Sequence, residues 1–406
     1  MRNLFLDKWP FFILSAFPLL GMRLTVWAIA LFTLSALVKG KFSLKQDVPT
    51  GFLFACVGLF LIILIRSLIP EYNKESLSYI EVSISLLVLP LAFHLKKDLF
   101  DANDKAIATW IFVSSATAVF VFGMTKALFL VSSIDLSNHA ELSFHIRTYF
   151  EETVNYHPTY ASIIAGIAIL KLLDLFIVDV KKRVLTGVLI LIMLTILALL
   201  ASRTPIASTL GCMILLTALR SKSIMNTLAM LVIIAGSIAL FYTLVPSFSS
   251  RFKEVSIVNT QIPDKKSEDS FNLRVGIFKC GMDIIKENWL WGVGTGKMNS
   301  RMNECYDTVA AEVYKDRNYN THNQLMDYWG RLGLMGPLGL VLIFLAAFFS
   351  LWMKKDWCGF CLALLLLGAI QTENLLTRQH GIVTFCYFLG LHIFAFRNPD
   401  NNTLDR

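Results

Sequence analysis

The sequence predicts an all-α membrane protein that crosses the bilayer many times, and three observations predict it. Of the 406 residues, 55% are hydrophobic and only 16% are charged, whereas soluble domains average about 25% charged residues. The mean hydropathy of +0.61 leaves too little polar surface to cover the core of a water-soluble globule. Long runs that carry few or no charges also recur, and each can cross about 30 Å of hydrocarbon as a helix. These features exclude a soluble enzyme.

About twelve transmembrane helices are expected. The clearest are the charge-free runs 184–202, 224–250 and 332–353. The other expected spans are 9–20, 24–38, 51–69, 79–95, 106–131, 157–176, 204–219, 357–371 and 381–396. Because this number is even, both termini are expected on the same side of the membrane.

Lysine and arginine concentrate in every second connection, at positions such as Lys39, Lys96, Lys105, Lys181 and Lys354. By the positive-inside rule, these connections and both termini are cytoplasmic. The net charge of +8 is then explained by anionic membrane lipids, with no need for nucleic acid as a partner.

The spans divide the chain into three parts: residues 1–250 with nine transmembrane helices, a polar loop domain at 251–331, and residues 332–406 with three more helices and a cytoplasmic tail. The loop domain falls on the outer, periplasmic side. In it, Phe271, Val275, Phe278, Met282 and Ile285 recur at spacings of four and three, which predicts an amphipathic helix lying on the membrane. A tryptophan- and glycine-rich turn follows at 289–296.

Motifs for nucleotides and metals are missing from the sequence. The glycines at 292–296 lack the strand and the acidic residue of a dinucleotide fingerprint, and neither a Walker lysine motif nor a zinc motif occurs. We therefore expect no cofactor and no metal. Of the seven cysteines, Cys280 and Cys305 fall outside, where a disulfide is an open possibility, whereas Cys358 and Cys361 read as buried thiols.

His322 is the first candidate for chemistry, because it stands where the loop domain leads into the next span. The dipole at a helix start disfavours an imidazolium, which keeps the ring able to accept a proton near pH 7. A general base is one interpretation, and a capping or interfacial histidine is the other.

Two arginines are candidates for binding phosphate. Arg203 follows an apolar span directly, and Arg274 lies early in the amphipathic helix, so both are expected near the outer interface. A guanidinium can hold a phosphate through two hydrogen bonds. The alternatives are an interfacial anchor for Arg203 and a solvated helix charge for Arg274.

Further polar residues open the sixth span at the same side. His157 and Tyr160, preceded by Arg147, are candidates for binding sugar hydroxyls, although interface anchoring explains them as well. Glu373, Arg378 and His380, in the last outside connection, are weaker candidates.

These residues resemble the O-antigen ligase and polymerase superfamily of bacterial envelope glycosyltransferases. The segment His322-Asn323, nine residues, Gly333, two residues and Gly336 is similar to a ligase motif, and Arg203, Arg274 and the glycine turn are similar to other features of the family. The resemblance covers mainly residues 155–340. The chain departs from the family at Thr204-Pro205, where a small residue usually follows the serine–arginine pair.

The resemblance implies a fold similar to GT-C glycosyltransferases and an enzyme of the bacterial inner membrane with a periplasmic active site. It implies an inverting, metal-independent transfer of a glycan from undecaprenyl pyrophosphate to a sugar of the lipid A core. His322 would be the general base, Arg203 and Arg274 would bind the pyrophosphate, and Asn323 would lie beside the substrates.

Other functions stay open at this point. A polymerase of O-antigen or exopolysaccharide and a protein O-oligosaccharyltransferase share the same chemistry. A polysaccharide flippase or transporter would also have many spans, but the middles of the clearest spans carry no charge of the kind that marks a transport pathway. A purely structural protein would leave His322, Arg203 and Arg274 unexplained.

Overall fold

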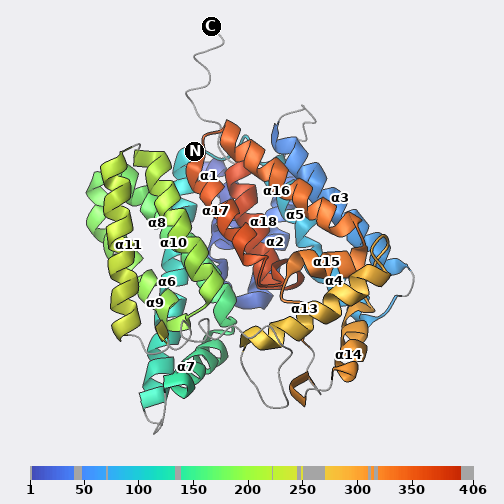
Figure 1. Cartoon of the computed structure of the whole chain (residues 1–406). Coiled ribbons are helices and arrows are strands. Elements are labelled where there is room, and N and C mark those ends of the chain that lie inside the picture. Colours follow the sequence, from blue (N-terminus) through green and yellow to red (C-terminus); the bar gives the residue numbers. More distant parts are fainter. Residues whose placement is uncertain are drawn as a thin grey trace.

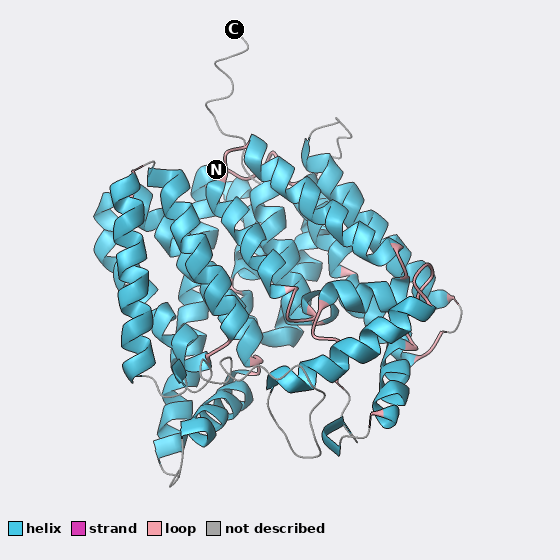
Figure 2. Ribbon diagram, viewed as in Figure 1, coloured by secondary structure: helices cyan, strands magenta, loops and turns pink. Residues whose placement is uncertain are grey.

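A computed structural model gives an all-helical chain, with no strand among the residues it describes (Figure 2). These are residues 2–40, 48–69, 72–132, 139–221, 223–244, 248–249, 270–309, 312–314 and 319–394. The helices are α1 (Arg2–Ser15), α2 (Phe17–Lys39), α3 (Val48–Leu68), α4 (Lys74–Ser83), α5 (Ser85–Leu95), α6 (Ala102–Ser132), α7 (His139–Val154), α8 (Pro158–Val178), α9 (Arg183–Leu200), α10 (Arg203–Ser221), α11 (Ile224–Leu244), α13 (Ser270–Glu287), α14 (Met298–Thr308), α15 (Gln324–Leu332), α16 (Met335–Met353), α17 (Trp357–Ala369) and α18 (Gln379–Ile393). Short 3₁₀ turns lie at Val180–Lys182, Glu312–Tyr314 and Leu375–Thr377.

The protein is a multi-pass membrane protein, but the expected count of twelve spans is not reached. Nine helical stretches in the described part of the chain are long and apolar enough to cross a membrane. They are Phe17–Val38, Pro49–Leu68, Lys74–Leu95, Ala102–Ser132, Pro158–Val178, Val180–Leu200, Arg203–Ser221, Ile224–Thr243 and Met335–Met353. The other three expected spans correspond to α1, α17 and α18, which have only 14, 13 and 15 residues.

The shortness of these three helices affects the site. At 1.5 Å per residue, none of them covers the hydrocarbon thickness alone. The chain between α17 and α18 is nevertheless largely buried, with Glu373, Asn374, Leu375 and Leu376 all at most 6% exposed. Within a membrane, irregular backbone is tolerated only where it is buried in protein or lies beside a water-filled cavity.

The core lies around α18, whose residues from Gly381 to Ile393 are all buried. Aromatic rings from α1, α2 and α6 pack around it, as where Phe112 meets Phe388 edge-on with centroids 4.7 Å apart. In contrast, α11 stands at one side of the bundle, and most of its surface is uncovered (Figure 1). Such an apolar surface is suited to lipid.

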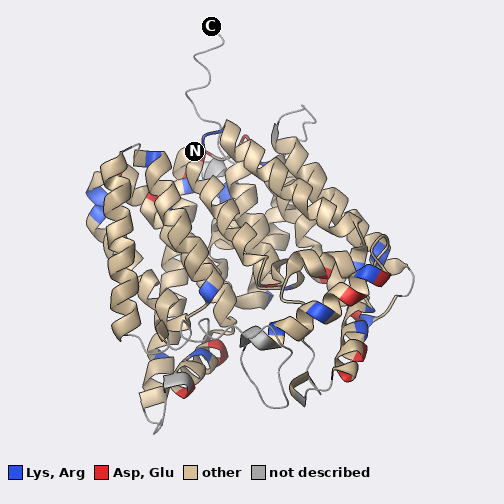
Figure 3. Ribbon diagram, viewed as in Figure 1, with Lys and Arg blue, Asp and Glu red and all other residues tan. Residues whose placement is uncertain are grey.

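Charged residues gather at the two ends of the bundle and on α7, α13 and α14, whereas the middles of the upright helices carry few (Figure 3). One end holds several lysines and arginines of the connections expected to be cytoplasmic. There, Lys105 pairs with Asp356 at 3.0 Å, and Asp356 contacts Nδ1 of His392 at 2.7 Å. Lys171 contacts the other ring nitrogen of His392 at 3.1 Å. Lys171, His392, Asp356 and Lys105 thus form a continuous series of side-chain contacts.

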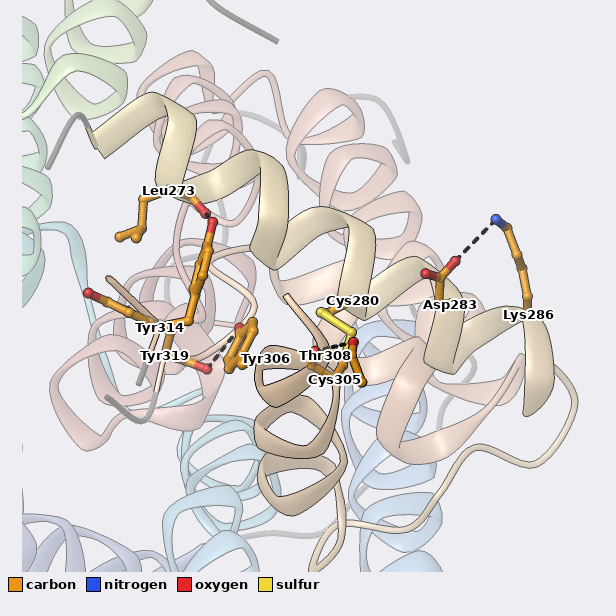
Figure 4. The surroundings of a disulfide bond; sticks show 9 residues. All are labelled: Leu273, Cys280, Asp283, Lys286, Cys305, Tyr306, Thr308, Tyr314 and Tyr319. Carbon is orange, nitrogen blue, oxygen red and sulfur yellow. Dashed lines mark hydrogen bonds and ion pairs between the residues drawn. A yellow bond between two sulfur atoms is a disulfide. The ribbon is translucent and has the colours of Figure 1, made fainter. Parts of the chain in front are cut away.

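The helices α7, α13, α14 and α15 gather at the other end (Figure 1). A disulfide joins Cys280 of α13 to Cys305 of α14 (Figure 4), while Cys358 and Cys361 are buried free thiols as expected. The prediction of a helix near 271–285 is confirmed by α13, while its contact with the membrane stays a prediction. Ile277, Cys280 and Ile284 pack against α14, whereas Phe278 is 57% exposed.

The glycines of the ligase-like motif form the junction between α15 and α16. Gly333 has a φ of 69°, in the left-handed region that glycine tolerates, and a Cβ there would collide with the main chain of Leu290. A Cβ on Gly292 would collide in turn with the main chain at 331–333, and one on Gly336 would meet the carbonyl of Tyr328. The glycines therefore let the turn at 289–296 pack backbone to backbone on the end of α15.

Arg331, near the end of α15, ties this region together. Its guanidinium is buried and bonds to Asp327 at 2.9 Å, to Glu75 at 2.8 Å and to Asn299 at 2.8 Å, and it also donates to the carbonyl of Thr295. These partners belong to α15, α4, α14 and the glycine turn. Arg331 thus fixes the loop domain on the transmembrane helices.

Candidate active site

The site is built where the segment 321–324 lies against the turn between α17 and α18. The hydrogen bonds that join these two segments are Thr321 Oγ1 to Asn374 Oδ1 at 3.0 Å, Asn323 Nδ2 to the Gln371 carbonyl at 3.1 Å, Gln324 N–H to the Ile370 carbonyl at 2.9 Å, and Leu376 N–H to Gln324 Oε1 at 2.7 Å. Thr321, Gln324 and Asn374 are buried. Residues about 50 positions apart in sequence are thus held in one rigid unit.

His322 projects from this unit toward Glu373. Its Nδ1 lies 3.6 Å from Oε2 of Glu373, just beyond hydrogen-bond length. The backbone of His322 has a φ of 46°, which is uncommon for a residue with a side chain, and its N–H donates to Oδ1 of Asn320 at 2.9 Å. Such a conformation persists only where its surroundings impose it, and functional sites are where it concentrates. His322 lies just before Asn323, which caps α15.

Glu373 is the anionic centre of the site. Burial alone would raise the pKa of its carboxyl, but His322, His157 and Arg274 together hold this pKa below its usual value of 4.5. Glu373 is therefore ionised at neutral pH. The structure thus brings three of the residues predicted from sequence, His322, His157 and Arg274, within electrostatic reach of one buried carboxylate.

His157 belongs to the same group of charges. It caps α8 through its Nδ1, and although the residue is exposed, the protein around the ring removes part of its water and so lowers the pKa of the imidazole. Glu151 and Glu373 raise the pKa of His157, whereas Arg147 and His322 lower it further. Arg147 on α7 thus lies close enough to influence the site.

Arg203 begins α10, directly after the tight turn that the sequence predicts. Ala201 ends α9 in a left-handed conformation with a φ of 48°, so the chain reverses within two residues. Farther along α10, Ser208 lies against Gly368 of α17. The start of α10 therefore lies at the same end of the bundle as the end of α17, which leads to Glu373.

Two candidate substrate-binding residues use their polar atoms within the protein. Asn323 caps α15 through Oδ1, which accepts from the Met326 N–H at 2.9 Å, while its amide nitrogen donates to Gln371. The hydroxyl of Tyr160 donates to the Asn374 carbonyl at 3.3 Å. Both residues therefore help to hold the site in shape, and their contact with a substrate stays a prediction.

Sequence reasoning undervalued Glu373 and overlooked Asn374. The available signal was an acidic residue beside an asparagine in a connection flanked by apolar runs, which is an expensive place for a charge. Among the described residues, no group of three or more His, Cys, Asp or Glu side chains is arranged to hold a metal ion.

Fold and site together define a multi-pass membrane protein with a histidine–carboxylate pair and basic residues at one end of its helices. The model of one protein family, O-antigen ligase, matches residues 188–341, and this match confirms the resemblance to the O-antigen ligase and polymerase superfamily. The matched part runs from α9 into α16 and contains Arg203, Arg274 and His322, whereas Glu373 lies beyond it. No curated protein matches this chain.

Proposed function

We propose that this protein is an O-antigen ligase that transfers a glycan en bloc from undecaprenyl pyrophosphate to a sugar hydroxyl of the lipid A core. The family match supports the broader statement, an enzyme of the ligase or polymerase type and thus a membrane glycosyltransferase. The observation that carries the proposal is that Nδ1 of His322 lies 3.6 Å from the buried Glu373 carboxylate, in two segments that hydrogen bonds such as Thr321–Asn374 hold together. A histidine oriented by a carboxylate is suited to take a proton from a hydroxyl.

In the proposed reaction, the acceptor oxygen attacks the anomeric carbon of the glycan from the side opposite the pyrophosphate. The new carbon–oxygen bond forms as the bond to pyrophosphate breaks, so the configuration inverts, and undecaprenyl pyrophosphate leaves with the bonding electrons. The hydroxyl proton passes to Nε2 of His322, because Nδ1 faces Glu373. The carboxylate stabilises the imidazolium that forms.

Arg274 and Arg203 have the complementary role at the leaving group. Negative charge on the pyrophosphate grows in the transition state, and guanidinium groups placed beside it lower the barrier. Arg274 acts on Glu373 electrostatically, which places a positive charge close to the proposed base. No metal or nucleotide is required for this scheme.

We place the site in the periplasm and both termini in the cytoplasm, in a bacterial inner membrane. Although nine candidate spans are an odd number, α1 and the end of α18 lie at the same end of the bundle, because Lys8 pairs with Asp104 and the neighbouring Lys105 pairs with Asp356, which contacts His392. The disulfide between Cys280 and Cys305 supports this orientation, because disulfides persist in oxidising compartments and are rare in the cytosol. The lysines and arginines at the opposite end, such as Lys105 and Arg220, support it through the positive-inside rule.

The test of this function is glycan transfer by the purified protein in detergent with a chelator, from an undecaprenyl-pyrophosphate glycan to lipid A core. We expect the glycan to appear on the lipid A core, in a gel that resolves lipid products. Longer chains on the donor lipid would identify a polymerase instead, and transfer to a protein hydroxyl an oligosaccharyltransferase. Absence of every product would contradict a glycosyltransferase.

An apolar crevice one helical turn along α10 from Arg203 is a suitable place for part of the prenyl chain of the donor. Leu197 and Ala198 of α9, Ile206 of α10 and Phe241 of α11 line it. Ile206 lies one turn after Arg203, so a lipid that enters from the bilayer could place its pyrophosphate near the arginine.

Filling this crevice should weaken binding of donors with long prenyl chains. Ser237 lines it from α11, and we expect Ser237→Phe to raise the KM for an undecaprenyl donor about tenfold, by displacing apolar contacts. A donor with a truncated prenyl chain should be little affected. The control is Ala235→Phe on the exposed surface of the same helix. Equal KM values for both variants would remove the crevice from the donor site.

A further inference from the structure

The loop domain has a small core of its own. Leu273, which precedes Arg274, and Tyr319, which lies three residues before His322, pack against this core. The core contains Ile277 and Ile284 of α13, Met298 and Met302 of α14, and two tyrosines, Tyr306 and Tyr314. Both tyrosines are 2% exposed. The disulfide joins α13 to α14 covalently within this core, since Cys280 belongs to the core and Cys305 precedes Tyr306 (Figure 4).

Three tyrosines form a continuous contact, which we call the tyrosine bridge: Tyr306, Tyr314 and Tyr319. The rings of Tyr306 and Tyr314 are stacked, with centroids 5.2 Å apart and an angle of 14° between planes. Tyr319 packs edge-on against both, at 6.4 Å and 6.1 Å. Aromatic pairs in such geometries add stability beyond the area that they bury.

Each end of the bridge is bonded to the main chain beside a proposed site residue (Figure 4). The hydroxyl of Tyr314 donates to the carbonyl of Leu273 at 2.9 Å, and Leu273 precedes Arg274. The hydroxyl of Tyr306 donates to the carbonyl of Tyr319 at 3.4 Å, three residues before His322. Gly276 leaves room for this contact, because a Cβ there would collide with the Tyr314 ring.

We infer that Tyr306 and Tyr314 are positioning residues that set the distance between Arg274 and His322. This inference rests on the proposed function, in which Arg274 binds the pyrophosphate and His322 takes the acceptor proton. Donor and acceptor must meet at a fixed separation, and an error near 1 Å in placing catalytic groups costs much of the rate. Neither tyrosine touches a substrate in this scheme.

The test uses Tyr314→Phe and Tyr306→Phe, which keep the stacked rings and remove only the hydroxyls. We expect Tyr314→Phe to lower kcat about threefold to tenfold, in the range of one lost hydrogen bond, with the donor KM within about twofold of the wild-type value. Tyr306→Phe should have a smaller effect, because its hydrogen bond is longer. The control is Tyr242→Phe, on the uncovered side of α11.

Hydrogen–deuterium exchange separates this inference from the proposed function. Tyr314→Phe should speed amide exchange at 273–277, whether or not a glycan donor has been identified. A kcat equal to that of Tyr242→Phe would overturn the positioning role, as would a loss of rate that only follows the folded fraction. Wild-type protein that transfers no glycan would refute the proposed function, and unchanged exchange would refute the bridge by itself.

Discussion

His322→Ala is expected to lower kcat by about 10²–10⁴-fold, the range that general base catalysis contributes in enzymes. In the proposed reaction its imidazole accepts the proton of the acceptor hydroxyl at Nε2, since Nδ1 faces Glu373. The donor KM should change little, because the base acts on the acceptor hydroxyl. Transfer to lipid A core, measured with saturating donor, provides the rate.

The matched control for His322 is His145→Ala. His145 is on α7 and stacks on Tyr149 with centroids 5.9 Å apart, outside the unit that holds His322. His145→Ala should retain nearly the wild-type rate, and His322→Gln, which keeps a polar side chain, should be as inactive as His322→Ala. A His322→Ala protein that is folded and has wild-type kcat would rule out His322 as the base.

Arg331→Met should give the largest loss of stability, about 3–5 kcal/mol in the free energy of unfolding. The arginine and Asp327 are both buried, with side chains only 5% and 1% exposed, so the change leaves an uncompensated carboxylate inside the protein. Among the described residues, the Tyr79 hydroxyl, which donates to Asp327 at 2.9 Å, would remain as the side-chain partner of this carboxylate. Unfolding by SDS in mixed micelles measures the loss.

Arg301→Met is the corresponding surface change on α14. Arg301 pairs with Glu287 and Glu304, each at 3.1 Å, but its side chain is 42% exposed. Solvent-exposed pairs contribute about 0–1 kcal/mol, so this variant should unfold almost like the wild type. If Arg331→Met were no less stable than Arg301→Met, the buried network would not be what holds the loop domain in place.

Much of the architecture was predictable from sequence, because hydropathy determines which segments can cross a membrane. The nine candidate spans agree with nine of the expected twelve, and the abrupt turn before Arg203 was read from the chain. The lengths of α17 and α18 were not predictable, since their apolar runs continue into a turn that only tertiary packing buries.

The candidate site was predictable only in part, because local patterns reveal some of its residues and tertiary contacts decide the others. His322 and Arg274 stand out in local patterns, and the structure brings both into electrostatic reach of Glu373. Glu373 itself was undervalued, because its importance comes from hydrogen bonds between segments about 50 residues apart. Apolar residues occupy two sides of α13, and sequence alone does not say that Ile277 and Ile284 meet protein while Phe278 stays exposed.

The shortness of α17 and α18 has a consequence for the choice between transfer and hydrolysis. Glu373 and its neighbours are buried within the protein, where the effective dielectric constant is below that of bulk water. Attraction between guanidinium groups and a pyrophosphate is stronger in such surroundings, and fewer water molecules compete with the sugar hydroxyl for the activated carbon. We therefore expect the glycan to reach its acceptor more often than it is lost to water.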